Sequence, residues 1–492
     1  MRAGLLVTDA GMPRVMNGRQ LTALVPRDTW HYRLVMSFDQ ITFQPAQLHP
    51  AAAEAIDKDA TALVAAVEVG TMEQQESSSF KSRRIPKHTI TDEDLIGEPL
   101  MTWSDLSGRT AGRYFVRDGQ LVALREQGYR QLRRLVEKVL RAKPFSAGFS
   151  ETFLEVEIFK WWRATLRGET SAPLSTQLLN VAGDAFALHR IMVPLAHLEI
   201  ERPFKLGHVL VTPFDAQLFD TFESEAVVKF PEHADVMRQE AQKMRDEFGH
   251  LTAIQVDIAG EVEFAQERAR VLAFDMADIV RFMSPPAVSW NITYACFPTG
   301  YEHEPSSTVI QLRDDKLALI SSGLLGAPSF RWKLSFAELD KLMTKLQFRN
   351  CAVFFEKRSL TGYEKRVKTA ISAYAQAVAA IDLRNRLIYA MSAAEHLLLR
   401  DENEPIQASV GERMAFLIAK EPDTRRAVVA NFKKAYGLRS RHVHHLANID
   451  DEDVLTVFFA NMWTMLLTAM QNLPRFQEQA QFLDAIDRIK FA

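Results

Sequence analysis

Residues 384–399 read RNRLIYAMSAAEHLLL, and the spacing of their apolar side chains predicts a helix with one buried face. The apolar positions recur every three or four residues, as they do along one side of an α-helix. These positions are Leu387, Ile388, Met391, Ala394 and Leu398. We therefore expect this stretch to be a core helix in the C-terminal part of the chain.

More helices are predicted on both sides of this one, and no stretch after residue 355 has a strand pattern. Pro422 suits the first turn of a helix, and the acidic run at 450–453 suits the positive N-terminal end of the last one. The predicted helices cover residues 363–380, 384–399, 409–420, 422–436 and 451–473. Such a series of helices predicts a small helical bundle over residues 356–492.

The chain before residue 356 mixes helix and strand patterns. Helical spacing is found over residues 51–67, 118–143, 150–166, 261–283 and 336–346, and Ser335 with Glu338 predicts a capping box for the last of these. Strand patterns are found in residues 190–200, 204–214, 251–259, 308–313 and 331–336. The predicted fold class is α+β, with a mixed α/β N-terminal and middle region followed by an all-α bundle.

The predicted domain organisation has three consecutive parts. Residues 1–95 form a mixed N-terminal segment that ends in a polar linker over residues 72–92. Residues 96–355 form a mixed α/β region with no catalytic motif, which we interpret as a sensor or regulatory region. Residues 356–492 form the helical bundle.

Composition limits the classes of protein to which the chain can belong. Its 492 residues carry a net charge of −3, so any contact with nucleic acid must use a local patch. Two cysteines, Cys296 and Cys351, exclude a disulfide framework and suit a reducing compartment. The N-terminus has too short an apolar run for a signal peptide, and the apolar stretch 454–473 contains polar residues typical of a buried core helix. We expect a cytoplasmic protein with no membrane partner.

A cationic stretch follows the predicted core helix. Residues 424–449, TRRAVVANFKKAYGLRSRHVHHLANI, contain no acidic residue. They carry Arg425, Arg426, Lys433, Lys434, Arg439 and Arg441, together with His442, His444 and His445. Composition alone leaves two interpretations open, a solvated helix face or a surface that binds phosphate groups.

Glu395 lies within the apolar stripe of the predicted helix 384–399. A carboxylate on a core-facing stripe needs a partner, because burying it unpaired is costly. One interpretation is a structural ion pair with Arg384 or another arginine. The other is that Glu395 holds a catalytic cation in place.

Three segments carry a resemblance to a known family. The chain reads IYAMSAAEHLLL at 388–399, GERMAFLI at 411–418 and AYGLRSRHVHHL at 435–446, followed by a long apolar helix. Over residues 360–475 it resembles the Apea-like HEPN domain. The resemblance implies a helical bundle and, as in many HEPN proteins, a metal-independent ribonuclease with an Arg-x4–6-His motif. Here the motif runs from Arg439 to His444, with Ser440 after the arginine and His445 after the histidine.

The resemblance also implies roles for the site residues. Cleaving RNA without a metal requires proton transfer, which a histidine with a pKa near 6.5 performs at neutral pH, so His444 is the candidate acid or base. Arg439 would stabilise the phosphorane, and Glu395 would position it. Two motifs commonly meet across a HEPN dimer, so a homodimer is expected. The candidate RNA-binding residues are Ser440, Arg441, Lys433, Lys434, Arg425 and Arg426.

Helical geometry and ligand chemistry add two expectations. Five positions on a straight helix separate Arg439 from His444 by about 140°, so we expect the motif to straddle a helix end near Gly437. The three histidines lack a cysteine or carboxylate neighbour before Asp450, so no metal site and no cofactor is predicted. Phosphate-binding glycine loops and the Gly-x-Ser-x-Gly elbow do not occur.

Three hypotheses about function remain. The first is a dimeric endoribonuclease that cuts RNA, tRNA being one candidate, with residues 1–355 sensing a protein trigger or inhibitor. The resemblance implies antiviral or toxin-like defence by abortive infection as its biology. The second is a non-catalytic HEPN module that binds RNA or protein. The third treats the bundle as a dimerisation device and places the activity elsewhere.

Overall fold

The computed structural model describes residues 48–66, 68–70, 101–104, 110–117, 120–143, 145–214, 216–301, 306–313, 316–324, 329–401, 403–445 and 451–491. Inside these ranges, the side chains of residues 68–70, 101–127, 216, 306–324, 443–445 and 491 are not described. The linker predicted over residues 72–92 lies outside the described residues.

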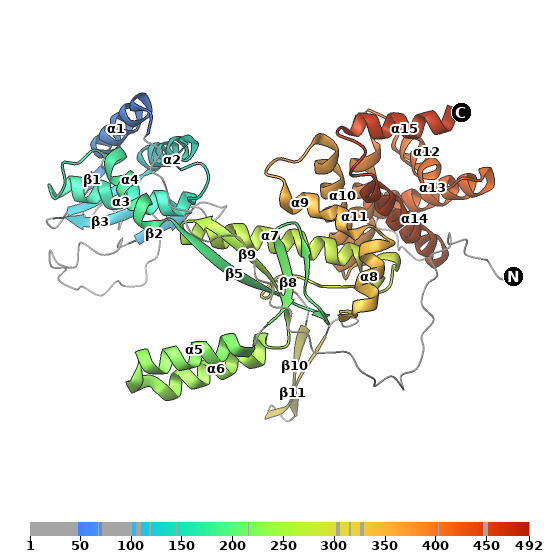
Figure 1. Cartoon of the computed structure of the whole chain (residues 1–492), viewed down its shortest axis with the longest axis horizontal. Coiled ribbons are helices and arrows are strands. Elements are labelled where there is room, and N and C mark those ends of the chain that lie inside the picture. The colour runs from blue at the N-terminus through green and yellow to red at the C-terminus, as the bar shows by residue number, and fades with distance from the viewer. Residues whose placement is uncertain are drawn as a thin grey trace. The chain divides into compact units, whose positions relative to one another are not determined.

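Helices and mostly antiparallel strands occur together in the described chain, which confirms the predicted α+β class (Figure 1). Spatial contacts divide the chain into two units. One contains the described residues of 36–191 together with 257–268, and the other contains residues 192–256 together with 269–492. The three consecutive domains expected from sequence stay a prediction.

The unit built from residues 36–191 and 257–268 has a four-stranded antiparallel sheet and a group of helices. Its sheet has the order β1-β4-β3-β2. The core lies between the helices and is filled by side chains such as Ile56, Leu132 and Trp162, each at most 1% exposed. The elements are α1 (Pro50–Ala65), β1 (Glu68–Gly70), β2 (Met101–Ser104), β3 (Thr110–Arg117), β4 (Gln120–Arg125), α2 (Glu126–Arg141), α3 (Glu151–Leu166) and α4 (Leu174–Ala185).

The helix predicted over residues 118–143 is wrong in its first part. Residues 120–125 form strand β4, which pairs with β3 so that Gln120 lies opposite Arg117. Two residues, Asp118 and Gly119, connect the strands, and an Asp-Gly pair is typical of two-residue hairpin connections. The helical spacing continues into the true helix α2 and conceals this turn signal.

The strands between residues 187 and 260 are ones that the sequence predicts well. A sheet of order β5-β9-β8-β7 is formed by β5 (Ala187–Leu195), β7 (Phe204–Leu206), β8 (Val209–Pro213) and β9 (Thr252–Gly260). Gly207 turns the chain between β7 and β8 with a φ of 59°. Strand β6 (Leu198–Ile200) pairs in parallel with β12 (Trp332–Leu334), and β10 (Ser306–Arg313) pairs with β11 (Lys316–Leu324).

Helices connect these strands and continue the chain. A hairpin of α5 (Ala216–Lys229) and α6 (Ala234–Phe248) was not predicted, whereas α7 (Val262–Met283) was, and it ends before Pro285. The capping box of α8 (Phe336–Thr344) is confirmed, because Ser335 and Glu338 each accept the backbone N–H of the other. A short α9 (Val353–Glu356) precedes the C-terminal helices.

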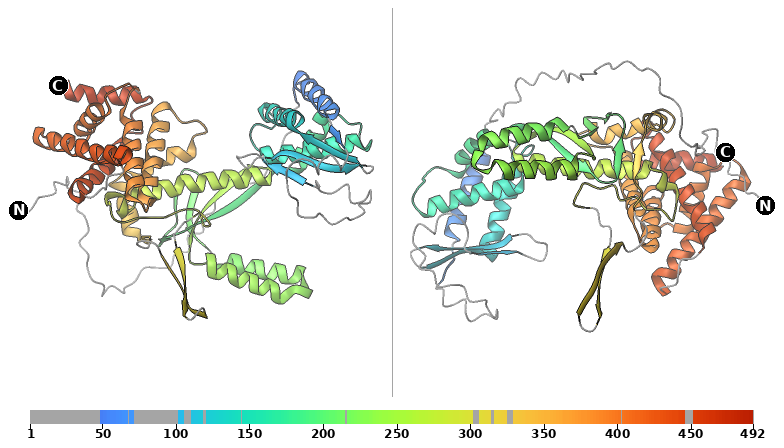
Figure 2. Two further views of the ribbon diagram at one scale, coloured as in Figure 1. Left: turned by 180° about the vertical axis from the view of Figure 1, so that it is seen from behind. Right: turned by 90° about the horizontal axis from the view of Figure 1, so that it is seen from below.

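The C-terminal part is helical throughout its described residues, as predicted (Figure 2). It contains α10 (Gly362–Ala379), α11 (Leu383–Leu398), α12 (Ile406–Ile418), α13 (Pro422–His445), α14 (Glu452–Gln471) and α15 (Gln479–Phe491). Two expectations were wrong. Helix α15 was missed, and α13 does not end at Tyr436 but continues to His445.

Helix α14 is the one helix among the described residues that is long and apolar enough to cross a membrane by length and composition. It lies inside the protein, since 56% of its most apolar window is buried and Phe458, Met462 and Leu466 are fully covered. Asp451 caps it by accepting the N–H of Val454 at 3.1 Å. These features fit the core helix expected from its polar residues.

Candidate functional site

Helices α11 and α13 bring Glu395 close to Arg439. Glu395 projects from the stripe of α11 whose members Met391, Ala394 and Leu398 are 0% exposed. Its own side chain is half-buried, and burial raises its pKa above the ordinary value while the positive charge of Arg439 opposes that rise. Arg439, 44 positions later in the chain, is thus near enough to act on Glu395 by its charge, but the two side chains form no hydrogen bond or ion pair.

Arg439 and Glu395 both keep unused hydrogen-bonding capacity. Glu395 Oε1 and Arg439 Nε are buried, and neither has a hydrogen-bond partner within the described part of the chain. Buried polar atoms are nearly always paired, so two neighbouring orphans of opposite charge are unusual. The guanidinium of Arg439 also lies 5.9 Å from the centre of the Tyr436 ring. These two atoms therefore have hydrogen-bonding capacity that no described residue satisfies.

Arg384, the arginine suggested by sequence as a partner for Glu395, is placed elsewhere. It lies 3.9 Å from Asp382, which is the N-cap of α11. Sequence spacing left open which arginine lies near Glu395, and the packing of α11 on α13 places Arg439 there.

No family model, curated protein or solved structure matches this chain. The chemistry available at the site must therefore be inferred from its own residues.

The Arg-x4-His motif lies within one continuous helix. The expected helix end between Arg439 and His444 is wrong, because α13 includes both positions. Gly437 does not break the helix, since a helical glycine costs only about 1 kcal/mol relative to alanine and the buried Leu438 continues the core face. The backbone positions of Arg439 and His444 are then about 140° apart around the axis. The side chain of His444 lies outside the described residues.

The candidate RNA-binding cations are divided between two environments. Lys433, Lys434 and Arg441 are exposed, and none of them forms an ion pair with a described residue. Their positions lie about 120–160° around the helix axis from Arg439. The exposed basic face of α13 and the half-buried Arg439 therefore belong to opposite sides of one helix.

Arg425, Arg426 and Ser440 are less available for a ligand. Arg425 Nε donates to the carbonyl of Ala419 at 3.0 Å, and its guanidinium lies 4.3 Å from the centre of the Phe416 ring. Arg426 is exposed and pairs with Asp423. Ser440 is half-buried. Arg425 thus fastens α13 to the end of α12.

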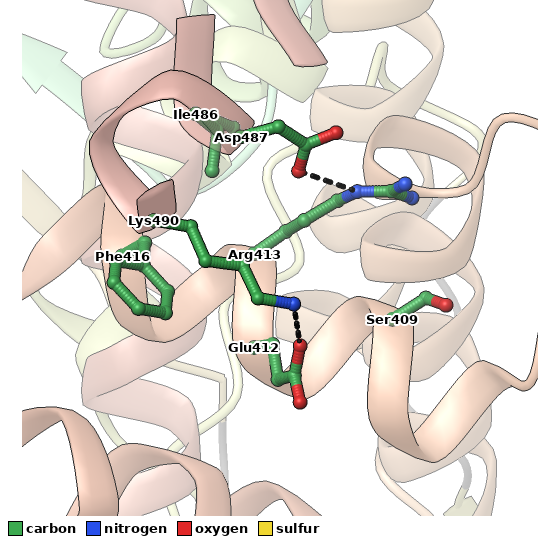
Figure 3. Close-up of a pocket in the computed structure, with 7 residues that line it drawn as sticks. All are labelled: Ser409, Glu412, Arg413, Phe416, Ile486, Asp487 and Lys490. Atoms are coloured by element: carbon green, nitrogen blue, oxygen red, sulfur yellow. Dashed lines mark hydrogen bonds and ion pairs between the residues drawn. The ribbon is translucent and has the colours of Figure 1, made fainter. Parts of the chain in front are cut away.

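A small cavity of about 160 Å³ between α12 and α15 was not predicted from sequence (Figure 3). Arg413 lies on one side of it, 3.7 Å from Asp487, and Lys490 pairs with Glu412. Arg413 also donates to both oxygens of Glu404, at 2.7 and 2.8 Å. These charges already have partners, so they hold α15 against α12. Sequence analysis did not predict the cavity, because it did not predict α15, which forms one side of it.

Metal ligation has no geometric support in the described part of the chain. No group of three His, Cys, Asp or Glu side chains lies close enough there to hold an ion. His442 is half-buried on α13, and the side chains of His444 and His445 are outside the description.

Proposed function

We propose that this chain is a dimeric, metal-independent endoribonuclease whose C-terminal helices form a HEPN-type bundle. The observation that carries the proposal is the Glu395–Arg439 pair on adjacent helices, half-buried and with an unpaired polar atom on each side chain. A guanidinium held in this way is suited to stabilising negative charge that develops on a phosphate.

In the proposed reaction, His444 removes the proton of the RNA 2′-hydroxyl or donates one to the departing 5′-oxygen. The 2′-oxygen attacks the adjacent phosphorus, the P–O5′ bond breaks, and a 2′,3′-cyclic phosphate forms. Arg439 neutralises the phosphorane, and Glu395 keeps the guanidinium in place.

The composite site requires a second chain. Arg439 and His444 occupy different sides of α13 in one chain, so a twofold arrangement that supplies the arginine from one chain and the histidine from the other resolves the geometry. Lys433, Lys434 and Arg441 then bind the RNA backbone outside the cleft. Abortive-infection defence in the cytoplasm, with residues 1–355 as the element that responds to a protein trigger or inhibitor, is the biology that we propose for this activity.

Single substitutions test the site. R439A and H444A should each abolish cleavage of a labelled RNA, with the fold intact by circular dichroism. H442A and H445A are the matched controls and should retain most of the activity. Products of the wild type should carry 2′,3′-cyclic phosphate ends, and cleavage should persist in EDTA. Wild-type rates for H444A, or loss of activity in EDTA, would contradict the proposal.

The second candidate function is a non-catalytic module that binds RNA. It is favoured by the exposed basic face of α13, which lies away from Arg439. Assays of K433A/K434A distinguish the two functions. If the protein is a nuclease, this variant needs a higher RNA concentration for cleavage. If the protein is a binding module, the variant binds RNA more weakly, and neither it nor the wild type cleaves RNA.

A further inference from the structure

Helix α2 presents a second basic surface, in the unit built from residues 36–191 and 257–268. Its buried side consists of Tyr129, Leu132, Val136 and Val139, each at most 1% exposed. On the opposite side, positions 130, 134, 137, 138 and 141 fall within an arc of about 100°. We call the cations of this face, Arg130, Arg134, Lys138 and Arg141, the α2 basic face.

The charge of this helix differs from that of the chain. Residues 126–143 contain six basic and two acidic residues, a net charge of +4 in a chain whose net charge is −3. The neighbouring carboxylates neutralise only part of it. Asp59 of α1 pairs with Lys138, and Glu137 lies 3.6 Å from Arg141, whose side chain is 82% exposed.

Arg130 and Arg134 are exposed cations of this face, and neither forms an ion pair with any side chain that the structure describes; the side chain of Glu126 is not among these. They are four positions apart, so about 6 Å of helix axis separates them, and about 16 Å separates Arg130 from Arg141. One strand of a nucleic-acid duplex carries about five phosphates over that length.

The chemistry of the face suits a polymer of anionic groups, of which the phosphate backbone matches its length. Three of its four cations are arginines, whose planar guanidinium binds two oxygens of a phosphate at once. A membrane surface is disfavoured, because helices that lie on membranes place Trp, Phe or Leu beside their cations and this exposed arc has none.

We propose that the α2 basic face is a nucleic-acid-binding site that contacts the phosphate backbone without reading base sequence. This site is separate from the basic face of α13 and does not depend on the proposed nuclease activity. Backbone contacts of this kind need no 2′-hydroxyl, so RNA and DNA of equal length should bind alike.

The test uses the full-length chain carrying R439A, K433A, K434A and R441A, which removes Arg439 and the exposed cations of the candidate site on α13. The probe is a fluorescein-labelled 20-nucleotide single-stranded RNA, with DNA of the same sequence alongside, and anisotropy is measured from 50 to 300 mM KCl. In this background, R130A/R134A should raise Kd about fivefold or more and lower the slope of log K against log salt by about 1.5.

The matched control is R238A/K243A on α6. It removes the same charge from two exposed side chains that already pair with Asp235 and Glu240, and it should leave Kd and the salt slope unchanged. R130K/R134K should retain most of the affinity, and R130Q/R134Q repeats the test with less change in side-chain length.

Three results would overturn the proposal. The first is equal binding by R130A/R134A and R238A/K243A. The second is an absence of binding by the background protein at 50 mM KCl. The third is displacement of the RNA by polyglutamate at equal charge concentration, which would assign the face to an acidic protein. Failure here leaves the RNA-cleavage test of R439A and H444A unaffected, because that assay uses the chain with the α2 face intact.

Discussion

Two glutamates near arginines in the C-terminal helices show how hydrogen-bond geometry determines the cost of a buried charge. Glu404 accepts two hydrogen bonds from Arg413, and these bonds lower its pKa. Glu395 is close enough to Arg439 to feel its charge but leaves Oε1 unpaired, so burial dominates and its pKa rises. Glu404 is therefore a stabilising carboxylate, whereas Glu395 is retained at a cost, as expected of a residue kept for function.

Glu395→Gln should raise thermal stability at neutral pH. Folding raises the pKa of the Glu395 carboxyl. The contribution of such a group to the free energy of unfolding is fully present below its pKa in the unfolded chain. This contribution is lost as the pH rises through its pKa in the folded chain. Glutamine cannot ionise, so the variant avoids that loss. We expect a higher Tm than the wild type at pH 7.5 and an equal Tm near pH 4, measured by calorimetry.

The same variant should cleave RNA more slowly, because Arg439 loses its anionic neighbour. A Tm difference that stays constant from pH 4 to pH 7.5 would contradict the assigned ionisation of Glu395. S392A, at a half-buried neutral position one turn earlier on α11, is the control and should show no pH-dependent difference.

Arg413→Ala should destabilise the protein by about 1–3 kcal/mol at pH 7, because it removes the donor to the carbonyl of Leu398 and leaves Glu404 with only the backbone N–H of Arg400. The pKa of Glu404 is lowered in the folded chain, so its contribution is present above the unfolded pKa and disappears as pH falls through the folded one. The difference in unfolding free energy should therefore shrink toward pH 3 in urea titrations. An equal loss of unfolding free energy at pH 7 and pH 3 would show that the interaction of Arg413 with the ionised Glu404 does not cause the destabilisation.

At the scale of elements, the length of α13 determines where Arg439 and His444 lie, because both belong to this helix. The helix continues through Gly437, at which an added Cβ would meet no atom within 4 Å. Gly437→Ala should consequently stabilise the protein by about 0.5–1 kcal/mol, since alanine restricts the unfolded chain and fits a helix interior. Urea unfolding followed by circular dichroism measures this change.

Gly411→Ala in α12 is the matched control. Its added Cβ would lie 3.3 Å from the ring of Phe432, so the gain should be smaller or reversed. Destabilisation by G437A would indicate that α13 ends near Gly437, as expected from the sequence, since a glycine that caps a helix often adopts a left-handed conformation that alanine disfavours.

At the scale of the whole molecule, the C-terminal helices share a core with the segment that precedes them. Arg386 is 1% exposed and donates to the carbonyls of Ile292 at 2.6 Å and of Pro286 at 3.2 Å. Tyr374 donates to Ala287 at 2.6 Å, and Trp463 donates to Phe282 at 3.0 Å. Removing residues 1–355 would leave the buried Arg386 without its acceptors, whereas Tyr374 would keep the carbonyl of Phe459 at 3.2 Å.

We therefore expect the fragment 356–492 to lack a cooperative thermal transition, whereas the fragment 192–492, which retains the segment 284–298 and the pairing of β6 with β12, should have one. Near-ultraviolet circular dichroism during heating distinguishes the two. A sharp transition in the shorter fragment would show that the bundle folds without the segment that Arg386 holds.

The full chain should be a homodimer, as the composite site requires. Light scattering at about 10 μM should give twice the 55.8 kDa of the chain, with an interface on the order of 1,200 Å² or more through residues 384–445. Mixing R439A with H444A chains should restore part of the cleavage, because one site in each mixed dimer keeps both groups. A monomeric mass would exclude the composite site.

Local sequence patterns were sufficient to predict many of the helices and strands of this protein. The period of apolar residues predicts α10, α11, α12 and α14, the serine and glutamate of a capping box place α8, and alternating residues place β8 and β9. These signals involve residues a few positions apart, whose preferences are expressed in any chain that buries one face. Glu395 was identified in the same way, from its position within an apolar stripe.

Tertiary structure alone decided the rest. Glu395 had several arginines available as partners, and only the packing of α11 on α13 selects Arg439. The same packing favours a continuous α13, in which the buried Leu438 offsets the local cost of Gly437. Strand β4 forms because β3 supplies its hydrogen bonds, although its residues continue the spacing of a helix. Contacts between residues far apart in the chain contribute free energy that cannot be read from a short segment. Where this contribution is larger than the conformational preference of the segment, the contacts decide its structure.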